Sequence, residues 1–298
     1  MDNLQVTYIM ACYNQAPYIS EAIYSVLNQT YQNIQLIVFD DCSTDGSIEV
    51  LKELNGKEKF TLIQNEINRG VNFNVLNAMK LATGNFIALL ASDDYVTVEK
   101  IEKQVAFLLQ TGNDAVFANG YSFNHEAKHL ITVDAVFKGN NKLKIQEYIC
   151  TCDWEAPLTQ SALFKRHLFD DLLSFRQEYK SDDWAFTIKA YEKYNVGFMD
   201  EPFFYYRLHD NNTHKKYWFT FPMRLEVVSK LIPEKFKIKG LSNIMFSQGN
   251  YLLADGKFFA GIKFYLSSVI FHISFKKIII MAKQILIYFK NLLKKGKV

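Results

Sequence analysis

Two pairs of adjacent aspartates stand at the ends of apolar runs in the sequence. Asp40 and Asp41 follow IQLIVF, and Asp93 and Asp94 follow FIALLA after the intervening Ser92. Carboxylate oxygens suit Mg²⁺ and Mn²⁺, and Mg²⁺ commonly takes one or two carboxylates together with substrate phosphates. Like charges held together repel one another, so a cation or a donor-rich ligand among them would relieve the repulsion. The two pairs therefore predict a site for a metal-bound diphosphate substrate.

Helix capping is the alternative explanation of these aspartates. Short polar side chains commonly cap helix N-termini, and they precede two expected helices here. The candidates for capping are Asp41, Ser43, Thr44 and Asp45 before a helix that starts near Ser47, and Asp94 or Thr97 before a helix over 98–109. The occurrence of two acidic pairs at equivalent strand ends favours a binding site.

The elements that must position these acids alternate along the first 120 residues. Apolar patterning predicts strands at 5–10, 34–39, 60–63 and 85–91, and helices at 19–28, 47–54, 71–81 and 98–109. Such alternation with short connections predicts an α/β domain with a mostly parallel sheet flanked by helices. Ligands bind at the carboxyl ends of the strands in these sheets, so both acidic pairs and the segment from Ala11 to Asn14 should lie on one rim.

The remainder of the chain is less regular until its last third. Polar turns and an aromatic-rich segment over 120–160 favour loops and short strands. A helix is expected from Asp182, a strand over 202–209, and helices from Tyr217 to the end. We expect a first domain at 1–215, in two parts at 1–118 and 119–215. A helical C-terminal region should then occupy 216–298.

Composition indicates a globular protein with a substantial core. The chain has 298 residues, of which 49% are hydrophobic and 22% charged. Its cysteines, at 12, 42, 150 and 152, are too few and too scattered for a disulfide framework. The first residues lack the pattern of a signal peptide. We therefore expect a cytoplasmic protein.

The C-terminal tail carries a charge opposite to that of the rest. Residues 256–298 contain nine lysines and no acidic residue, so the tail is about +9 and residues 1–255 are about −6, within a net charge of +3. Its longest lysine-free window, 264–275, is too short to span a bilayer. The pattern is typical of interfacial helices on an anionic membrane, which predicts a peripheral position on the inner face of the cell membrane. A helical appendage packed on the catalytic domain is the alternative. Nucleic acid is not expected as a partner, because the rest of the chain is acidic and no recognition motif is present.

Four segments carry a resemblance to a known family. They are VTYIMACYNQAPYISEAIYSVLNQTY, IQLIVFDDCSTDGS, NRGVNFNVLNAMKLATGNFIALLASDDY and SDDWAFTIKAY, and together they run through roughly the first 210 residues. They resemble the family 2 glycosyltransferases, inverting nucleotide-sugar enzymes with the GT-A fold. The resemblance implies inverting transfer of a hexosyl or N-acetylhexosaminyl group from a UDP-sugar. It makes residues 1–215 the catalytic domain, with a nucleotide-sugar half at 1–118 and an acceptor half at 119–215. The implied acceptor is a glycan or lipid-linked oligosaccharide in surface-polysaccharide synthesis, and the implied cofactor is Mn²⁺ or Mg²⁺.

The resemblance also implies roles for residues at the donor site. Ala11, Tyr13 and Asp41 would hold the base, with Tyr13 stacking on the ring and Asp41 accepting a hydrogen bond from uracil N3–H. Arg69 would approach the base or the diphosphate, and Asn14 and Ser92 belong to the same donor site. Asp93 and Asp94 would bind the metal and the donor ribose or sugar. The chain departs from the family's DxD motif here, since Ala91 stands where the first acid often lies.

The later segments supply the implied catalytic and acceptor residues. In SDDWAFTIKAY, Asp183 would be the general base that takes the acceptor's proton, with Asp182 beside it as orienter or substitute. The alternative for Ser181 and Asp182 is helix capping. In YRLHDNNTH, the candidates are Arg207, His209 and His214, with His209 the favoured metal ligand. Trp154 would line the acceptor pocket, because an indole face suits sugar C–H surfaces; core packing is the alternative.

Two other functions remain open at this point. A sugar-phosphate nucleotidylyltransferase shares an α/β nucleotide fold, but it would need a glycine-rich basic loop after the first strand, where this chain has ACYNQAPY. A non-catalytic protein that binds sugar nucleotides or glycans is compatible with Ala91 and Ser92 in the DxD region.

Overall fold

The computed structural model describes residues 4–124, 127–131, 135–139, 141–151, 157–178, 182–212 and 216–295. The chain divides into two compact units. Unit 1 comprises residues 1–142 and 157–209, and unit 2 comprises residues 143–156 and 210–298. Each unit is described by itself below.

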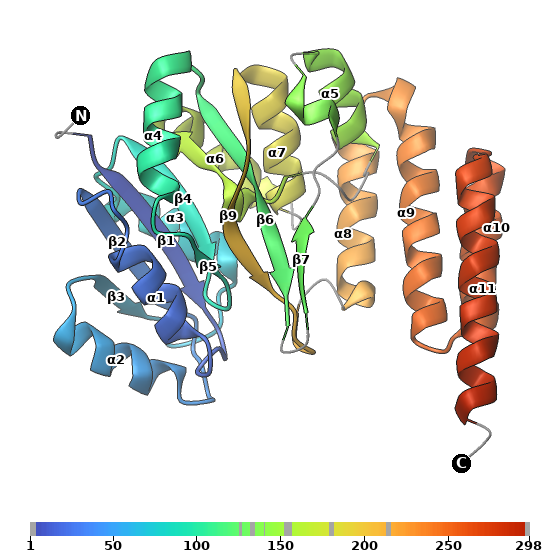
Figure 1. Cartoon of the computed structure of the whole chain (residues 1–298), viewed down its shortest axis with the longest axis horizontal. Helices are drawn as coiled ribbons and strands as arrows, with labels where there is room; N and C mark the ends of the chain where they lie inside the picture. The colour runs from blue at the N-terminus through green and yellow to red at the C-terminus, as the bar shows by residue number, and fades with distance from the viewer. Residues whose placement is uncertain are drawn as a thin grey trace. The chain divides into compact units, whose positions relative to one another are not determined.

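The described residues of unit 1 form one sheet of nine strands (Figure 1). The path through the sheet is β3-β2-β1-β4-β8-β6-β9-β5, and β7 pairs with β6. The strands are β1 Val6–Cys12, β2 Ile34–Asp40, β3 Thr61–Gln64, β4 Phe86–Ala91, β5 Tyr95–Val96, β6 Ala115–Phe123, β7 Lys128–Ile131, β8 Leu163–Lys165 and β9 Val196–Arg207.

Six of these strands run in the same direction. β3, β2, β1 and β4 pair in parallel. β8 is antiparallel to both β4 and β6, so β6 runs with β4, and β9 is parallel to β6. The carboxyl ends of β1, β2, β4, β6 and β9 therefore meet at one edge, which we call the carboxyl rim. The predicted α/β fold with a mostly parallel sheet is confirmed, with antiparallel strands confined to β5, β7 and β8.

Alternation along the strands assigns each face of the sheet to its own helices. Even-numbered residues of β1, such as Tyr8 and Met10, are buried in a cluster with α1 Ile19–Leu27, α2 Ser47–Lys57 and α4 Lys100–Thr111. Successive side chains of a strand point to opposite faces. The other face is covered by α3 Val71–Leu81 and α6 Arg166–Glu178 (Figure 1). Each helix thus buries one apolar stripe on the sheet.

The half of unit 1 that follows β4 has an aromatic core. α7 Asp182–Lys193 packs beside α6, and Phe186 of α7 makes an edge-to-face contact with Phe164 of β8 at 5.2 Å between ring centroids. Phe117 of β6 contacts both Phe164 and Tyr191. Such ring contacts add to the free energy of burial. Two 3₁₀ turns, η1 Ala135–Lys138 and η2 Thr159–Ser161, complete the unit.

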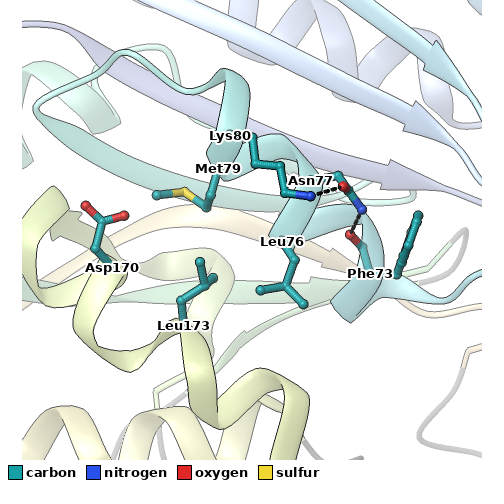
Figure 2. Close-up of a pocket in the computed structure, with 7 residues that line it drawn as sticks. All are labelled: Phe73, Leu76, Asn77, Met79, Lys80, Asp170 and Leu173. Carbon is teal, nitrogen blue, oxygen red and sulfur yellow. Dashed lines mark hydrogen bonds between the residues drawn. The ribbon is translucent and has the colours of Figure 1, made fainter.

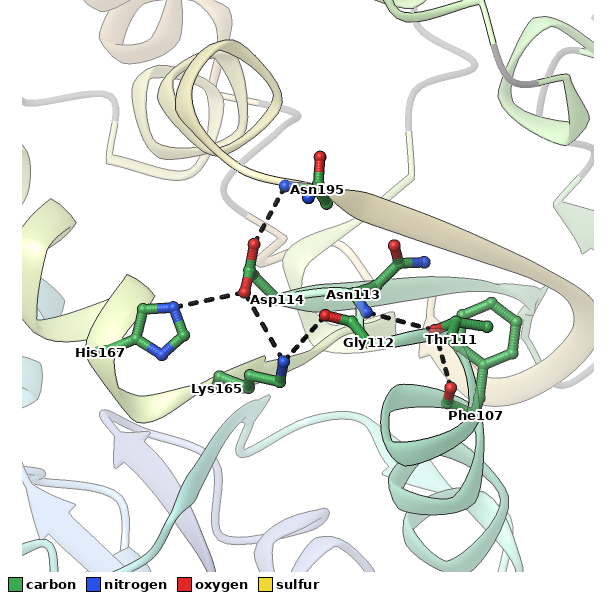
Figure 3. A network of polar contacts seen from close by, with 8 residues as sticks. All are labelled: Phe107, Thr111, Gly112, Asn113, Asp114, Lys165, His167 and Asn195. Carbon is green, nitrogen blue, oxygen red and sulfur yellow. Dashed lines mark hydrogen bonds and ion pairs between the residues drawn. The ribbon is translucent and has the colours of Figure 1, made fainter.

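A polar network fastens the edge opposite the carboxyl rim (Figure 3). Asp114, just before β6, accepts a hydrogen bond from the backbone N–H of Asn195 before β9, at 3.2 Å. Its other oxygen lies 3.3 Å from His167 Nε2 and 3.6 Å from Lys165 Nζ. Lys165 also donates to the carbonyl of Gly112, at 3.0 Å. These contacts join the amino ends of β6 and β9 to the carboxyl end of β8.

Unit 2 is helical in its described residues. Its helices are α5 Lys142–Cys150, α8 Tyr217–Lys230, α9 Glu234–Ala254, α10 Phe258–Phe271 and α11 Phe275–Lys295. Gly249 of α9 and Gly261 of α10 allow close packing, since a Cβ on either would lie 3.1 Å from the other's carbonyl oxygen. Among the described helices, none has both the length and the apolarity needed to cross a lipid bilayer.

The two compact units and the predicted domains divide the chain differently. Residues 143–156, which the sequence placed in the acceptor half, group with the C-terminal helices in unit 2. The functional division at residues 118 and 215 stays a prediction.

Candidate active site

The loops that follow β1 and β2 are tied together on the carboxyl rim. The backbone N–H of Asn14 donates to Ser43 Oγ at 3.0 Å, and Asn14 Oδ1 accepts from the backbone N–H of Thr44 at 2.8 Å. Asn14 has a positive φ of 55°, a conformation that asparagine tolerates better than most residues. Tyr13 directly precedes Asn14 in the loop after β1, and 48% of its surface is exposed. Its ring is therefore available for stacking on a planar ligand, while Asn14 shapes the loop.

Asp45 belongs to the same junction and lies just before helix α2. Its Oδ1 accepts from the backbone N–H of Ser47 at 3.0 Å, and its Oδ2 accepts from that of Ala16 at 3.0 Å. Partial burial alone would raise the pKa of Asp45, but the hydrogen bonds from Ser47 and Ala16 outweigh burial and lower it. Asp45 thus accepts from the first N–H of α2, although the N-cap position is held by Gly46 and has no side-chain capping bond.

Asp41 is buried and anchors the loop before α3. Its Oδ1 accepts from Asn65 Nδ2 and from the backbone N–H of Arg69, both at 2.8 Å, and its Oδ2 accepts from the backbone N–H of Gly70 at 2.8 Å. An ionised carboxylate has about four lone-pair sites, so about one remains for a ligand. Asp41 is therefore a structural anchor with room to accept one further hydrogen bond.

The anchored loop presents the Arg69 side chain to solvent. Arg69 is exposed, and its guanidinium carbon lies 5.3 Å from the ring centroid of Phe73. Gly70 follows with a φ of 83°, which glycine adopts without strain. A guanidinium held at a loop beside Asp41 is placed to meet an anionic ligand.

Asp93 and His209 form a close pair across the rim. Asp93, in the turn after β4, has Oδ2 at 2.9 Å from Nε2 of His209, which follows β9. Two adjacent ligands of an octahedral ion with bonds of about 2.1 Å lie about 3.0 Å apart. A carboxylate and an imidazole at this separation are of the ligand types that suit a divalent ion, and in this structure they are hydrogen-bonded to each other. Within the described part of the chain, no group of three or more His, Cys, Asp or Glu is arranged to hold a metal.

Asp94 has one satisfied and one unsatisfied oxygen. Its Oδ1 accepts from the backbone N–H of Arg207 at 2.8 Å. Its Oδ2 is buried with no partner among the described residues. Burial and then the neighbouring charge of Asp93 raise the pKa of Asp94 well above its ordinary value. An unpaired buried carboxyl oxygen is costly, so it points to a ligand group that completes the site.

Arg207 fixes the turn that carries both aspartates. Its Nε donates to the backbone carbonyl of Asp93 at 2.9 Å, and its guanidinium pairs with Glu21 of α1. The guanidinium also lies between the rings of Tyr18 and Phe123, at 4.7 and 4.5 Å from their centroids. Arg207 thus connects the end of β9 to the turn after β4 and to α1.

The predicted general base lies at the start of α7. Asp183 is exposed, and its Oδ1 accepts a hydrogen bond from Thr159 Oγ1 at 2.9 Å. Thr159 is buried and belongs to η2, which contacts β4 and β6. Asp182 begins α7, but its side chain lies outside the described residues, as do Trp154 and His214.

The structure brings most of the predicted donor residues onto the carboxyl rim. Tyr18 links their two groups, because it follows the Asn14 loop and its ring lies 5.2 Å from that of His209. Ala11 is partly buried at the end of β1, and Ser92 is buried against the thiol of Cys12. Burial raises the pKa of Cys12 to about 11, so that thiol is inert packing.

Sequence reasoning missed two contributors to the site. Thr159 carried no signal, because a threonine in a loop has no characteristic spacing. Lys100 occupies a buried position of α4 together with Ile101 and Gln104. The sequence feature that could have indicated it is a lysine at a position where the helical period predicts an apolar residue.

A pocket of about 350 Å³ lies away from these residues, between α3 and α6 (Figure 2). It is lined mostly by apolar side chains, with Lys80 and Asp170 at its margin. None of the predicted site residues lines it, so we do not assign it to the donor. The lining residues are Phe73, Leu76, Asn77, Met79, Lys80, Asp170 and Leu173.

Comparison with known proteins now identifies the family. Residues 7–210 match the family model described as "Glycosyl transferase family 2", which covers more than half of the chain. The chain belongs to glycosyl transferase family 2. The resemblance seen in the sequence is thereby confirmed, and the residues of the carboxyl rim lie inside the matched range.

Curated members of glycosyl transferase family 2 match the chain over part of their length. The UDP-Glc:α-D-GlcNAc-diphosphoundecaprenol β-1,3-glucosyltransferase WfgD of Escherichia coli is 37% identical over 128 residues, which cover 43% of this chain and 50% of WfgD. The chain spans half or less of the length of the first curated relatives that it matches.

Solved structures support the fold of this family 2 protein. Staphylococcus aureus TarS 1–349 in complex with UDP-GlcNAc aligns with a TM-score of 0.61 at 19% identity, over 89% of this chain and 82% of that one. The mannosyltransferase PcManGT of Pyrobaculum calidifontis, in complex with GDP-Man and Mn²⁺, aligns with a TM-score of 0.60 at 17% identity, over 96% and 81%. At these identities the likeness concerns the fold alone.

Proposed function

We propose that this protein transfers a hexosyl or N-acetylhexosaminyl group from a UDP-sugar to a glycan or lipid-linked oligosaccharide, with inversion, in the synthesis of a cell-surface polysaccharide. The observation that carries the proposal is the carboxyl rim. There an exposed aromatic ring, Tyr13, follows β1 and Asp41 follows β2, while a carboxylate–imidazole pair is formed by Asp93 after β4 and His209 after β9. This combination suits a base, a diphosphate and a cation.

The donor base is proposed to bind at the loops after β1 and β2. Tyr13 would stack on the base, beside Ala11 at the end of β1, and the remaining acceptor site of Asp41 would take uracil N3–H. The arrangement supports a pyrimidine base, because Asp41 is held as an acceptor by three N–H donors. Among the similar proteins, WfgD is a UDP-Glc-dependent glucosyltransferase and TarS has been solved in complex with UDP-GlcNAc.

A divalent cation, Mn²⁺ or Mg²⁺, is proposed beside the diphosphate. Asp93 and His209 would hold it, and an imidazole in the set favours Mn²⁺ over Mg²⁺. When bound, such an ion stabilises charge on a departing diphosphate. The unpaired Oδ2 of Asp94 is available to the donor ribose or sugar, and the exposed Arg69 to the diphosphate.

Asp183 is proposed as the general base. In an inverting displacement the acceptor hydroxyl oxygen forms a bond to C1 of the sugar while the bond from C1 to the diphosphate oxygen breaks. The hydroxyl proton passes to the Asp183 carboxylate, and UDP leaves. Exposure of Asp183 leaves it open to an acceptor, and the hydrogen bond from Thr159 orients its carboxylate. Asp182 and Trp154 keep their predicted roles, as orienter of the base and as acceptor contact.

A donor screen tests the proposed activity. The full chain is incubated with UDP-, GDP- and dTDP-sugars, with Mn²⁺ or with chelator, and release of the nucleoside diphosphate is measured against candidate acceptors. We expect UDP release that needs both the ion and an acceptor. Pyrophosphate exchange would instead indicate a nucleotidylyltransferase, and donor binding without any turnover would indicate a non-catalytic binding protein.

Replacement of the proposed base separates catalysis from donor binding. Asp183→Asn removes the proton acceptor and keeps the shape of the side chain, so kcat should fall by at least 100-fold. Donor affinity, measured by calorimetry with UDP, should stay within about twofold because the base does not contact the nucleotide. Full turnover by Asp183→Asn would show that another group takes the proton.

A further inference from the structure

Helix α11 has an inner and an outer face. Partly buried residues recur at helical spacing on the inner face, which packs on α9: Ile280, Met281, Gln284, Ile285 and Tyr288. The outer face also carries large apolar side chains, although they are exposed. Leu286 is 62% exposed and Phe275 is 79% exposed. A surface helix normally presents polar residues outward, so this outer face is unusual.

The outer face combines an apolar stripe with a row of lysines. Ile279 and Leu286 stand seven residues apart, and so do Lys283 and Lys290; all four side chains are exposed. At 100° per residue each pair returns to within about 20° of the same direction. The lysines are therefore aligned along one side of the stripe formed by Phe275, Ile279, Leu286 and Phe289. We call this surface the outer stripe. Of its residues, Phe289 is 45% exposed and also contacts the ring of Phe258 in α10, at 5.3 Å between centroids.

The charge of the surroundings narrows the choice of partner. No acidic residue occurs from position 256 to the end of the chain, while nine lysines do. A helix that paired with a second copy of itself would bring these lysines together without compensating acids, which is unfavourable. A partner that accepts both apolar side chains and a dense row of cations must be apolar inside and anionic at its surface.

We propose that the outer stripe of α11 binds the surface of an anionic lipid bilayer. The helix would lie parallel to the membrane, with Ile279, Leu286 and the phenylalanines among the acyl chains and Lys283 and Lys290 at the phosphate groups. Further exposed apolar side chains precede α11, since Ile270 near the end of α10 is 82% exposed and Ile273 in the following connection is 76% exposed. The inference goes beyond the proposed transfer reaction and does not depend on it.

Vesicle co-sedimentation of the full chain tests this binding. The probes are vesicles of phosphatidylcholine alone and vesicles that also contain phosphatidylglycerol. We expect binding to the anionic vesicles that weakens with salt. Each lysine near an anionic surface contributes roughly a fivefold change in affinity, so Lys283→Gln with Lys290→Gln should weaken binding by about 25-fold. The matched control is Lys52→Gln with Lys59→Gln, two exposed lysines of unit 1, and it should bind like the wild type.

A second variant tests the apolar part of the surface. Ile279→Gln with Leu286→Gln keeps every charge and should weaken vesicle binding by more than about tenfold. Circular dichroism melting checks that each variant is folded. Three outcomes would overturn the proposal: no binding to anionic vesicles, equal loss in the unit 1 control, or a concentration-dependent dimer that the apolar variant abolishes while vesicles are ignored.

Discussion

Asp41 and Asp94 occupy similar places after parallel strands, but their carboxylates have different surroundings. Asp41 receives three N–H donors from the loop before α3. Asp94 receives one from Arg207 and keeps a buried oxygen unpaired. The sequence predicted that both acids reach one rim, because strand direction determines where strand ends meet. It did not predict these partners, because they come from loops whose conformation has no periodic signal.

At the residue scale, Thr159 should stabilise the ionised form of the proposed base, Asp183, to which it donates a hydrogen bond. Thr159→Val removes the donor to Asp183 and keeps the shape of the side chain. The ionised carboxylate loses a hydrogen bond that favours it, and the proposed role of Asp183 as general base requires the ionised form. The acidic limb of the kcat–pH profile should therefore move to higher pH, by about half a unit to one unit.

Two comparisons make the Thr159 prediction specific. Thr159→Ser retains the hydroxyl and should restore the wild-type pH profile. The apparent affinity for UDP should be unchanged in both variants. A uniform loss of rate at every pH, with no displacement of the limb, would assign Thr159 to packing only.

At the element scale, α4 supports η2 from inside the protein. The fully buried Lys100 donates to the carbonyl of Ala162 at 3.2 Å, and Gln104 donates to that of Ser161 at 2.7 Å. Ser161 and Ala162 lie two and three residues after Thr159 in the chain. The helix thus holds the segment that carries the partner of Asp183, which explains why a lysine occupies an apolar position.

Lys100 should make stability depend on pH. Burial lowers its pKa in the folded protein to about 7, against about 10.4 in the unfolded chain. Between these values the unfolded state binds more protons, so stability rises with pH by up to about 1.4 kcal/mol per unit. Lys100→Met lacks this contribution, so its stability relative to wild type should improve as the pH falls from about 10 to about 7.

Urea unfolding at several pH values measures this difference. Lys52→Met is the control, since the side chain of Lys52 is exposed. If the difference between Lys100→Met and wild type stays constant across the window, the buried lysine does not titrate as its surroundings indicate.

The sequence predicted most elements of the first 120 residues, because each shows clear strand or helix periodicity there. It missed α6 Arg166–Glu178 and α5 Lys142–Cys150. α6 follows directly on the short strand β8, without a turn signal to separate the two. α5 is only nine residues long, so its helical pattern was weak beside the polar turns around it.

At the scale of the whole molecule, each compact unit has buried apolar residues of its own. Unit 1 has the layered core around β1, and unit 2 buries residues such as Val227, Ile244 and Leu252 among its helices. The sequence distinguished the two regions by charge and periodicity. It could not assign 143–156 to the second, because that assignment depends on packing between distant segments.

Calorimetry should separate the two units. All proposed donor contacts lie in unit 1, so UDP with Mn²⁺ should stabilise its unfolding transition by about 2.7 kcal/mol at 100 times Kd. The transition of unit 2 should not move. A common shift of a single transition would show that the units unfold together.

Because β1, β2, β4, β6 and β9 run in one direction, the proposed binding segments and the structural polar network lie at opposite edges of the sheet. The segments proposed to bind the donor emerge from one end of the strands, while Asp114 and its neighbours connect the amino ends of β6 and β9 at the other. Insertions in the segments at the carboxyl rim should leave the polar network around Asp114 unchanged. A scaffold of this kind can acquire new acceptor preferences by exchanging surface segments, with little penalty in folding.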